Sequence, residues 1–269
     1  MLRIGIIGCG FIGSELARFI TNYLNDQAVL VAIYDRNEKK AYKLADELNP
    51  HPDVIPAESI PLHCELVIEA AGQACCEEIV PKALGLGRDV MVMSAGGLAD
   101  RYEEFAELAR QKKAKIYIPS GAIAGIDGLE AAMLSNVTSV KLTTRKPPAS
   151  FIDSPLVKAK NYDLKNLKEP ALLFEGSARE ALKDFPQNIN IAATLSMAGV
   201  GFDETQVIII ADPTLTQNVH ELEVIGDFGK MNVHIENVPA PQNPKTSYLA
   251  VMSASATMLE ILKPLKIGT

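Results

Sequence analysis

Gly8-Cys9-Gly10-Phe11-Ile12-Gly13 is the stretch that decides the fold of this 269-residue chain. The apolar run Leu2–Ile7 precedes it, and Ser14–Leu24 follows with apolar residues at helical spacing. A glycine-rich turn between a strand and a helix lets a pyrophosphate approach the backbone and rest on the free N–H groups of the helix start. The stretch therefore predicts a dinucleotide-binding unit with ligand contacts at Gly8, Gly10, Phe11, Ile12 and Gly13.

Asp35 closes the next apolar strand, Ala28–Tyr34. A carboxylate at this position suits hydrogen bonds from the adenosine ribose and repels a 2′-phosphate, so it favours NAD. Arg36 lies next to it and could accept that phosphate, which leaves NADP as an alternative. Asp35 thus joins the expected cofactor-binding residues.

Strands and helices alternate up to about residue 120, which predicts a doubly wound parallel sheet, the Rossmann fold, over residues 1–120. After Pro119 the pattern changes to an α+β domain over residues 121–245 with a largely antiparallel sheet. A helix is expected over Ser120–Ser135 and a loop over residues 149–170. Four strands are expected, at Val140–Arg145, Gln206–Ala211, Val219–Gly226 and Lys230–Asn237. Residues 246–269 hold a last helix, Thr246–Leu262, which is expected to return to the first domain.

Composition excludes several partners and sites. The net charge of −7 argues against nucleic acid, and no apolar run reaches the length of a membrane span. The four cysteines form no Cys-x-x-Cys pair, so neither a metal site nor a disulfide framework is expected. The start Met1–Gly5 leads directly into a strand-like segment, which favours a cytoplasmic location.

Polar candidates for chemistry lie in the second domain. His220 begins a strand, and an imidazole titrates near neutrality, as a dehydrogenase needs for moving a proton; a purely structural histidine is the alternative. Lys245, Thr246 and Ser247 precede the last helix, where they could seat a carboxylate or simply cap the helix. Arg145 is a further candidate for binding a carboxylate.

Seven segments in this order resemble the L-aspartate dehydrogenase family. They are Ile7–Gly13, Ser120–Asp127, Leu142–Pro148, Phe174–Ala178, Phe185–Ser196, Asn218–Glu221 and Asn243–Ala250. The glycine stretch is common to many families, whereas the later segments look specific to this one. The resemblance is weakest over residues 36–65 and 149–168.

The resemblance implies oxidative deamination of L-aspartate with NAD or NADP. Its product would be iminoaspartate, which supplies NAD biosynthesis or hydrolyses to oxaloacetate and ammonia. The resemblance also implies that His220 is the catalytic residue and that Ala124 and Asn190 contact the cofactor. A homodimer is expected, because the antiparallel sheet of the second domain could pair with a second copy.

Two other functions fit the same residues. One is a two-domain dehydrogenase of the homoserine or dihydrodipicolinate type, which a panel of substrates would distinguish. The other is a non-catalytic dinucleotide sensor, which would be stabilised by NAD without turning over any amino or hydroxy acid. The polar candidates Asn190, His220 and Lys245 argue against the sensor.

Overall fold

The computed structural model describes residues 1–186, 189–241 and 243–268; the side chains of Pro244 and Lys245 lie outside that description. The internal contacts divide the chain into two compact units. Unit 1 comprises Met1–Pro119 and Val251–Leu265, and unit 2 comprises Ser120–Ala250 and Lys266–Thr269. Among the described residues, no helix combines the length and apolar character that crossing a membrane requires.

Unit 1 is built on a six-stranded sheet in the order β3-β2-β1-β4-β5-β6, and every pair of neighbours is parallel. This confirms the predicted Rossmann fold. Its strands are β1 (Leu2–Ile7), β2 (Ala28–Tyr34), β3 (Asp53–Val54), β4 (Leu66–Glu69), β5 (Asp89–Val92) and β6 (Ile116–Tyr117). Its helices are α1 (Phe11–Tyr23), α2 (Glu38–Glu47), α3 (Ile60–His63), α4 (Gln73–Gly85), α5 (Tyr102–Lys112) and α10 (Tyr248–Leu262), with short 3-10 turns η1 (Ala57–Ser59) and η2 (Ala95–Leu98).

The core of unit 1 includes residues from the far end of the chain. Ile4 and Ile6 of β1 and Leu16 of α1 are fully buried in one apolar cluster. Ala254 and Met258 of α10 are fully buried in the same cluster. Burying a large apolar side chain contributes roughly 1.5–3 kcal/mol, so α10 is a substantial part of this core.

Unit 2 is built on a five-stranded sheet in the order β11-β10-β7-β9-β8. Three of its neighbouring pairs are antiparallel and one, β7 with β9, is parallel, which agrees with the predicted largely antiparallel sheet. The strands are β7 (Val137–Lys146), β8 (Ala171–Ser177), β9 (Thr205–Ala211), β10 (Asn218–Gly226) and β11 (Gly229–Asn237), with β12 (Pro239–Ala240) and β13 (Asn243–Ser247) pairing separately. The helices are α6 (Ile126–Ala132), α7 (Pro155–Ala159), α8 (Ala178–Asp184) and α9 (Asn190–Ala198), with turns η3 (Pro148–Phe151) and η4 (Leu164–Asn166).

The structure corrects several element boundaries. The helix expected over Ser120–Ser135 begins only at Ile126, because Gly125 has a φ of +83°, outside the helical range. Residues 149–170, expected as a loop, contain η3, α7 and η4. Strand β8 was not predicted; its register shifts between Leu172 and Phe174, which interrupts the alternation that would reveal it. The last helix begins at Tyr248 rather than Thr246.

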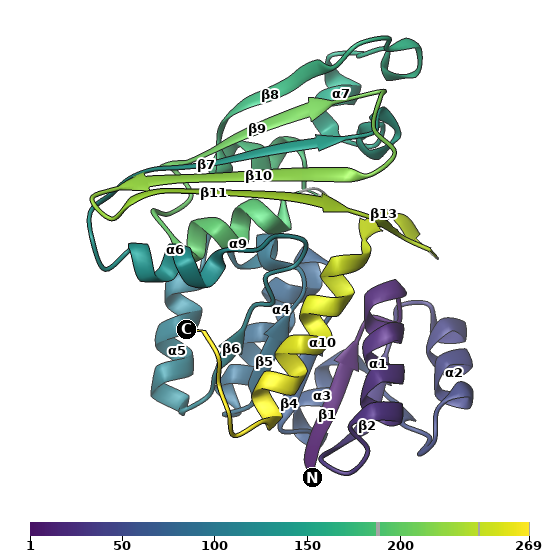
Figure 1. Cartoon of the computed structure of the whole chain (residues 1–269). Helices are drawn as coiled ribbons and strands as arrows, with labels where there is room; N and C mark the ends of the chain where they lie inside the picture. The colour runs from purple at the N-terminus through teal and green to yellow at the C-terminus, as the bar shows by residue number, and fades with distance from the viewer. Residues whose placement is uncertain (187–188, 242, 269) are drawn as a thin grey trace. The chain divides into compact units, whose positions relative to one another are not determined.

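The two faces of the five-stranded sheet differ in exposure. Helices α6 and α9 lie along one face (Figure 1). Along β7, Leu142, Thr144 and Lys146 are buried, whereas the alternating residues Thr143 and Arg145 are partly exposed. The buried face is therefore the helix-covered face, and a residue's parity along β7 determines which face it occupies.

Candidate functional site

In the glycine stretch of unit 1, Gly8 and Gly13 lie close against neighbouring backbone, whereas Gly10 faces open space. Gly8 has a φ of +103°, and a Cβ there would lie 2.5 Å from the carbonyl oxygen of Ala70. A Cβ at Gly13 would overlap the carbonyl oxygen of Gly8. At Gly10, by contrast, a Cβ would meet nothing within 4 Å. Gly8 and Gly13 thus allow the turn to form, while Gly10 leaves its outer surface open to a ligand.

Asp35 is held against this turn by backbone donors. Its Oδ2 accepts a hydrogen bond from the N–H of Cys9 at 2.8 Å, and its Oδ1 accepts one from the N–H of Asn37 at 2.8 Å. The carboxylate is therefore fixed at the carboxyl end of β2, beside the glycine turn. This is the edge of a parallel sheet where dinucleotides bind.

A pocket of unit 1 opens between these groups. Its lining comes from the glycine turn, the end of β2, the start of α2, the η1 turn and the start of α4: Gly8, Gly10, Tyr34, Asp35, Arg36, Lys40, Ala57, Glu58, Ala70, Ala71, Gly72, Gln73, Ala74, Cys75, Glu78 and Ile79. Phe11 and Ile12 begin α1, and Ile12 packs against the core instead of lining the pocket. The open glycine, the fixed carboxylate and the N-terminus of α1 fit a nicotinamide dinucleotide.

Glu69, at the end of β4, braces two turns at this edge of the sheet. Its Oε1 accepts hydrogen bonds from the N–H groups of Ala71 and Gly72, at 2.7 and 2.8 Å. Its two oxygens also accept hydrogen bonds from the backbone N–H and the hydroxyl of Ser94, each at 3.1 Å. Burial raises the pKa of this carboxyl although all four donors oppose the rise. Sequence reasoning passed over Glu69, because one acid in an apolar strand does not reveal its partners.

Replacing Glu69 with glutamine should weaken both the fold and dinucleotide binding. The amide nitrogen would meet N–H groups that need an acceptor, so the free energy of unfolding should fall by about 1–3 kcal/mol. Urea unfolding and NADH fluorescence titration measure the two effects. Glu107→Gln on the exposed surface of α5, which breaks an ion pair with Arg110, is the control and should change stability by less than about 1 kcal/mol. Equal behaviour of the two variants would contradict the bracing role.

His220 lies on the helix-covered face of unit 2. It is 1% exposed, and its Nδ1 is 3.0 Å from the hydroxyl oxygen of Thr144 on the neighbouring strand. Its Nε2 is buried without a hydrogen-bond partner among the described residues. Burial, and secondarily the charge of Lys146, lower the pKa of His220 to about 3. The imidazole is therefore neutral at physiological pH, and a buried nitrogen without a partner is characteristic of a group that meets a ligand.

Polar groups gather on this face around His220. Lys146 is 8% exposed, and burial lowers the pKa of its ammonium to about 8. Asn218, two residues before His220 on β10, is buried and donates a hydrogen bond from Nδ2 to the hydroxyl of Ser247 at 3.0 Å. The structure thus links Ser247 to the strand of His220. Thr246 instead accepts a hydrogen bond from Asn243 at 3.0 Å, and the Lys245 side chain lies outside the described residues.

The two cofactor contacts expected in unit 2 are both exposed. Ala124 lies in the loop before α6, and Asn190 is the first residue of α9. The backbone carbonyl of Asn190 accepts a hydrogen bond from the Thr194 hydroxyl at 3.0 Å. Their role toward a cofactor stays a prediction.

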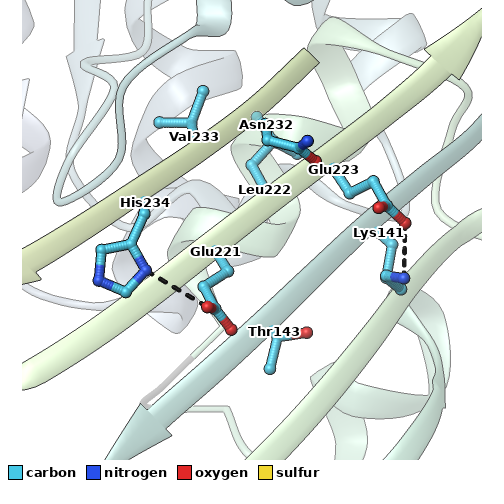
Figure 2. Close-up of a pocket in the computed structure, with 8 residues that line it drawn as sticks. All are labelled: Lys141, Thr143, Glu221, Leu222, Glu223, Asn232, Val233 and His234. Carbon is cyan, nitrogen blue, oxygen red and sulfur yellow. Dashed lines mark hydrogen bonds and ion pairs between the residues drawn. The ribbon is translucent and has the colours of Figure 1, made fainter. Parts of the chain in front are cut away.

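The open face of the sheet carries a separate set of charges. Figure 2 shows a shallow pocket there, with Glu221 directed toward His234 and Glu223 toward Lys141. The Glu221 carboxylate is 3.3 Å from His234 and 3.8 Å from Arg145. Arg145 therefore lies on the face opposite His220, so the structure does not bring this candidate together with the histidine. The basic residue on the face of His220 is its neighbour, Lys146.

Alternation along β7 was the signal that could have identified Lys146. Leu142 and Thr144 share its parity, and both are buried. The sequence did not single out Lys146, which directly precedes Pro147-Pro148 at the end of the strand. A lysine at an inward-facing position of a half-buried strand is unusual enough to indicate a functional site.

Two family profiles match the chain. The profile described as "Aspartate dehydrogenase, C-terminal" matches residues 127–261. The profile described as "Homoserine dehydrogenase, NAD binding domain" matches residues 8–119. The boundary between the two matches falls where the strand–helix alternation of the first half ends.

Individual proteins match over the whole chain. The L-aspartate dehydrogenase of Methanosarcina barkeri is 48% identical, and the match covers 100% of both chains. The crystal structure of aspartate dehydrogenase from Thermotoga maritima has a TM-score of 0.76 at 28% identity, again covering 100% of both chains. A homoserine dehydrogenase from Thiobacillus denitrificans has a TM-score of 0.63 at 14% identity, covering 97% of this chain and 73% of its own; it shares the fold.

Proposed function

This chain belongs to the aspartate dehydrogenase family, and we propose that it oxidises L-aspartate with NAD or NADP to iminoaspartate, which water converts to oxaloacetate and ammonia. The observation that carries the proposal is the neutral, buried imidazole of His220. Its Nε2 has no partner among the described residues, and it lies in a polar cluster that includes a buried cation. A proton acceptor beside a positive charge suits an acidic amino-acid substrate.

The cofactor sites follow from the geometry of unit 1. A nicotinamide dinucleotide held there would supply the acceptor for the hydride of the substrate Cα. We assign the pyrophosphate to the backbone of Gly8–Gly13, Phe11 and Ile12 included, and the adenosine ribose to Asp35. Ala124 and Asn190 are the expected cofactor contacts from unit 2.

His220 manages the proton in this proposal. Nε2 can accept a proton only if Nδ1 carries the other one, so Nδ1–H donates to the Thr144 hydroxyl oxygen. The proton that Nε2 takes comes from the substrate ammonium, or from the water that attacks the imine. Lys245, Thr246 and Ser247 are the expected substrate-binding residues, and Ser247 is the one linked through Asn218 to the strand of His220.

We further propose a cytoplasmic homodimer in which the open face of the unit 2 sheet meets a second copy. That face carries ion-pair groups of both signs, including Lys141, Glu223 and Lys230. A self-complementary surface of this kind suits a two-fold interface. Light scattering coupled to gel filtration measures the mass, and a monomer at micromolar concentration would contradict the proposal.

Replacing Asp35 with asparagine should shift the cofactor preference toward NADP. The change keeps the side-chain shape but removes the charge that repels a 2′-phosphate, while Arg36 and Lys40 of the same pocket attract that phosphate. We expect the ratio of kcat/KM for NAD to that for NADP to fall by about tenfold or more. The exposed Asp46→Asn on α2 is the control. An unchanged ratio in Asp35→Asn would remove this residue from cofactor selection.

A substrate panel tests the function as a whole. L-aspartate, L-glutamate, L-alanine and L-homoserine are each incubated with NAD or NADP, and absorbance of the reduced cofactor is followed. We expect turnover to be highest with L-aspartate. Preference for L-homoserine would identify the other dehydrogenase type, and stabilisation by NAD without any turnover would identify a sensor.

A further inference from the structure

Lys146 is a buried cation on the face of the sheet that holds His220. It ends β7, where it shares the parity of Thr144, and Thr144 contacts His220 directly. Its positive charge contributes, after burial, to the lowered pKa of His220. A buried ammonium is costly in free energy, so such groups are rare outside sites where the charge is used.

We propose that the ammonium of Lys146 binds one carboxylate of the substrate, an inference that rests on the function proposed above. A dicarboxylate needs two cationic or N–H-rich anchors. The segment before α10 was expected to supply one of them, and Arg145 is directed to the opposite face with Glu221. Lys146 supplies the second charge within the polar cluster of His220, where a charge-assisted hydrogen bond is strong because water is excluded.

The same contact would make His220 a better base when the substrate is present. Without substrate, burial and the Lys146 charge both oppose protonation of the imidazole. A carboxylate on Lys146 offsets that charge, so Nε2 takes up a proton more readily. Among the other charged groups, Glu221, Glu223 and His234 line the pocket on the open face. Asp212, directly after β9, is buried; its N–H donates to the carbonyl oxygen of Lys146, and its Oδ1 accepts hydrogen bonds from the N–H and hydroxyl of Thr214.

Three variants separate a binding role from a structural one. Lys146→Met removes the charge and retains the length and apolar stem of the side chain, a replacement that buried ionic sites tolerate. Lys146→Arg keeps the charge. Lys141→Met is the matched control, because it removes a lysine from the same strand but from the open face, where it pairs with Glu223.

Succinate, a dicarboxylate without a reacting amine, probes binding apart from chemistry. In Lys146→Met the inhibition constant of succinate and the KM for L-aspartate should both rise on the order of 30- to 100-fold, as for a lost charge-assisted hydrogen bond. Lys146→Arg should retain most of the binding, and Lys141→Met all of it. NADH affinity should be preserved in all three variants, because the dinucleotide pocket is in unit 1. The unfolding midpoint should also be preserved, because an apolar side chain of similar length can replace a buried charge without loss of stability.

Two results would overturn the proposal. One is an inhibition constant of succinate in Lys146→Met that lies within about twofold of the wild-type value. The other is a parallel loss of succinate and NADH affinity, which would indicate general damage rather than a lost anchor. If the wild type oxidises no amino acid, the proposed function fails instead, and calorimetric titration of succinate still tests Lys146 as a dicarboxylate anchor.

Discussion

Replacing His220 with alanine should lower kcat for L-aspartate by a factor of about 10²–10⁴, the usual contribution of a positioned general base. The imidazole is buried and neutral, and its Nδ1 lies 3.0 Å from the hydroxyl oxygen of Thr144. NADH affinity should stay within about twofold of the wild type, since the cofactor pocket is built from unit 1. Stopped-flow turnover and fluorescence titration measure the two quantities.

His234→Ala is the matched control for His220. It removes an imidazole from the same sheet, but one that lies on the open face between Glu221 and Glu236. Its turnover should be close to that of the wild type. Near-normal turnover in His220→Ala, or equal losses in the two variants, would remove His220 from the mechanism.

Gly13→Ala should disrupt unit 1, whereas Gly10→Ala should leave it folded but weaken its binding of the dinucleotide. The Cβ of an alanine at position 13 would overlap the Gly8 carbonyl oxygen, and backbone on both sides leaves little room to relax. A clash of this kind typically costs about 1–3 kcal/mol or more. At position 10 the backbone has a φ of −72° and the Cβ meets open space, so alanine is tolerated by the fold.

Thermal unfolding and NADH titration distinguish the two glycine variants. We expect Gly10→Ala to unfold near the wild-type temperature and to lose about tenfold or more in NADH affinity, because its methyl group occupies the space of the pyrophosphate. Gly13→Ala should unfold several degrees earlier. If Gly10→Ala bound NADH normally, the ligand would not lie over the glycine turn.

The Rossmann sheet could be predicted because local signals agree there. Strands β1, β2, β4 and β5 are mostly apolar, and helices α1, α2, α4 and α5 follow them in turn, so periodicity and glycine chemistry indicate the same fold. The two-residue edge strand β3 does not show this pattern. The second sheet was also recognised, since Val219–Gly226 and Lys230–Asn237 flank a hairpin turn. Strand β8 was missed because its register shift breaks the alternation.

The candidate site could be predicted only in part, because its residues meet through pairing rather than along the chain. His220 came from family resemblance, and nothing in the sequence near it specifies Thr144, which is 76 residues away. Choosing between Arg145 and Lys146 requires knowing which alternate residues of β7 face the helices. A shift of one residue in the pairing register of the strand would exchange its two faces. Glu69 likewise acts through backbone N–H groups, whose positions no sequence pattern displays.

The burial of Ala254 and Met258 in the core of unit 1 has a consequence for synthesis on the ribosome. A nascent chain that has emerged up to Pro119 contains every strand of the six-stranded sheet but lacks α10. Its apolar cluster is therefore incomplete until α10 leaves the exit tunnel, and residues 120–250 of unit 2 are made in the interval. The first unit to be synthesised thus waits for a helix that follows most of unit 2 in the sequence, and its exposed apolar surface is open to chaperones during that time.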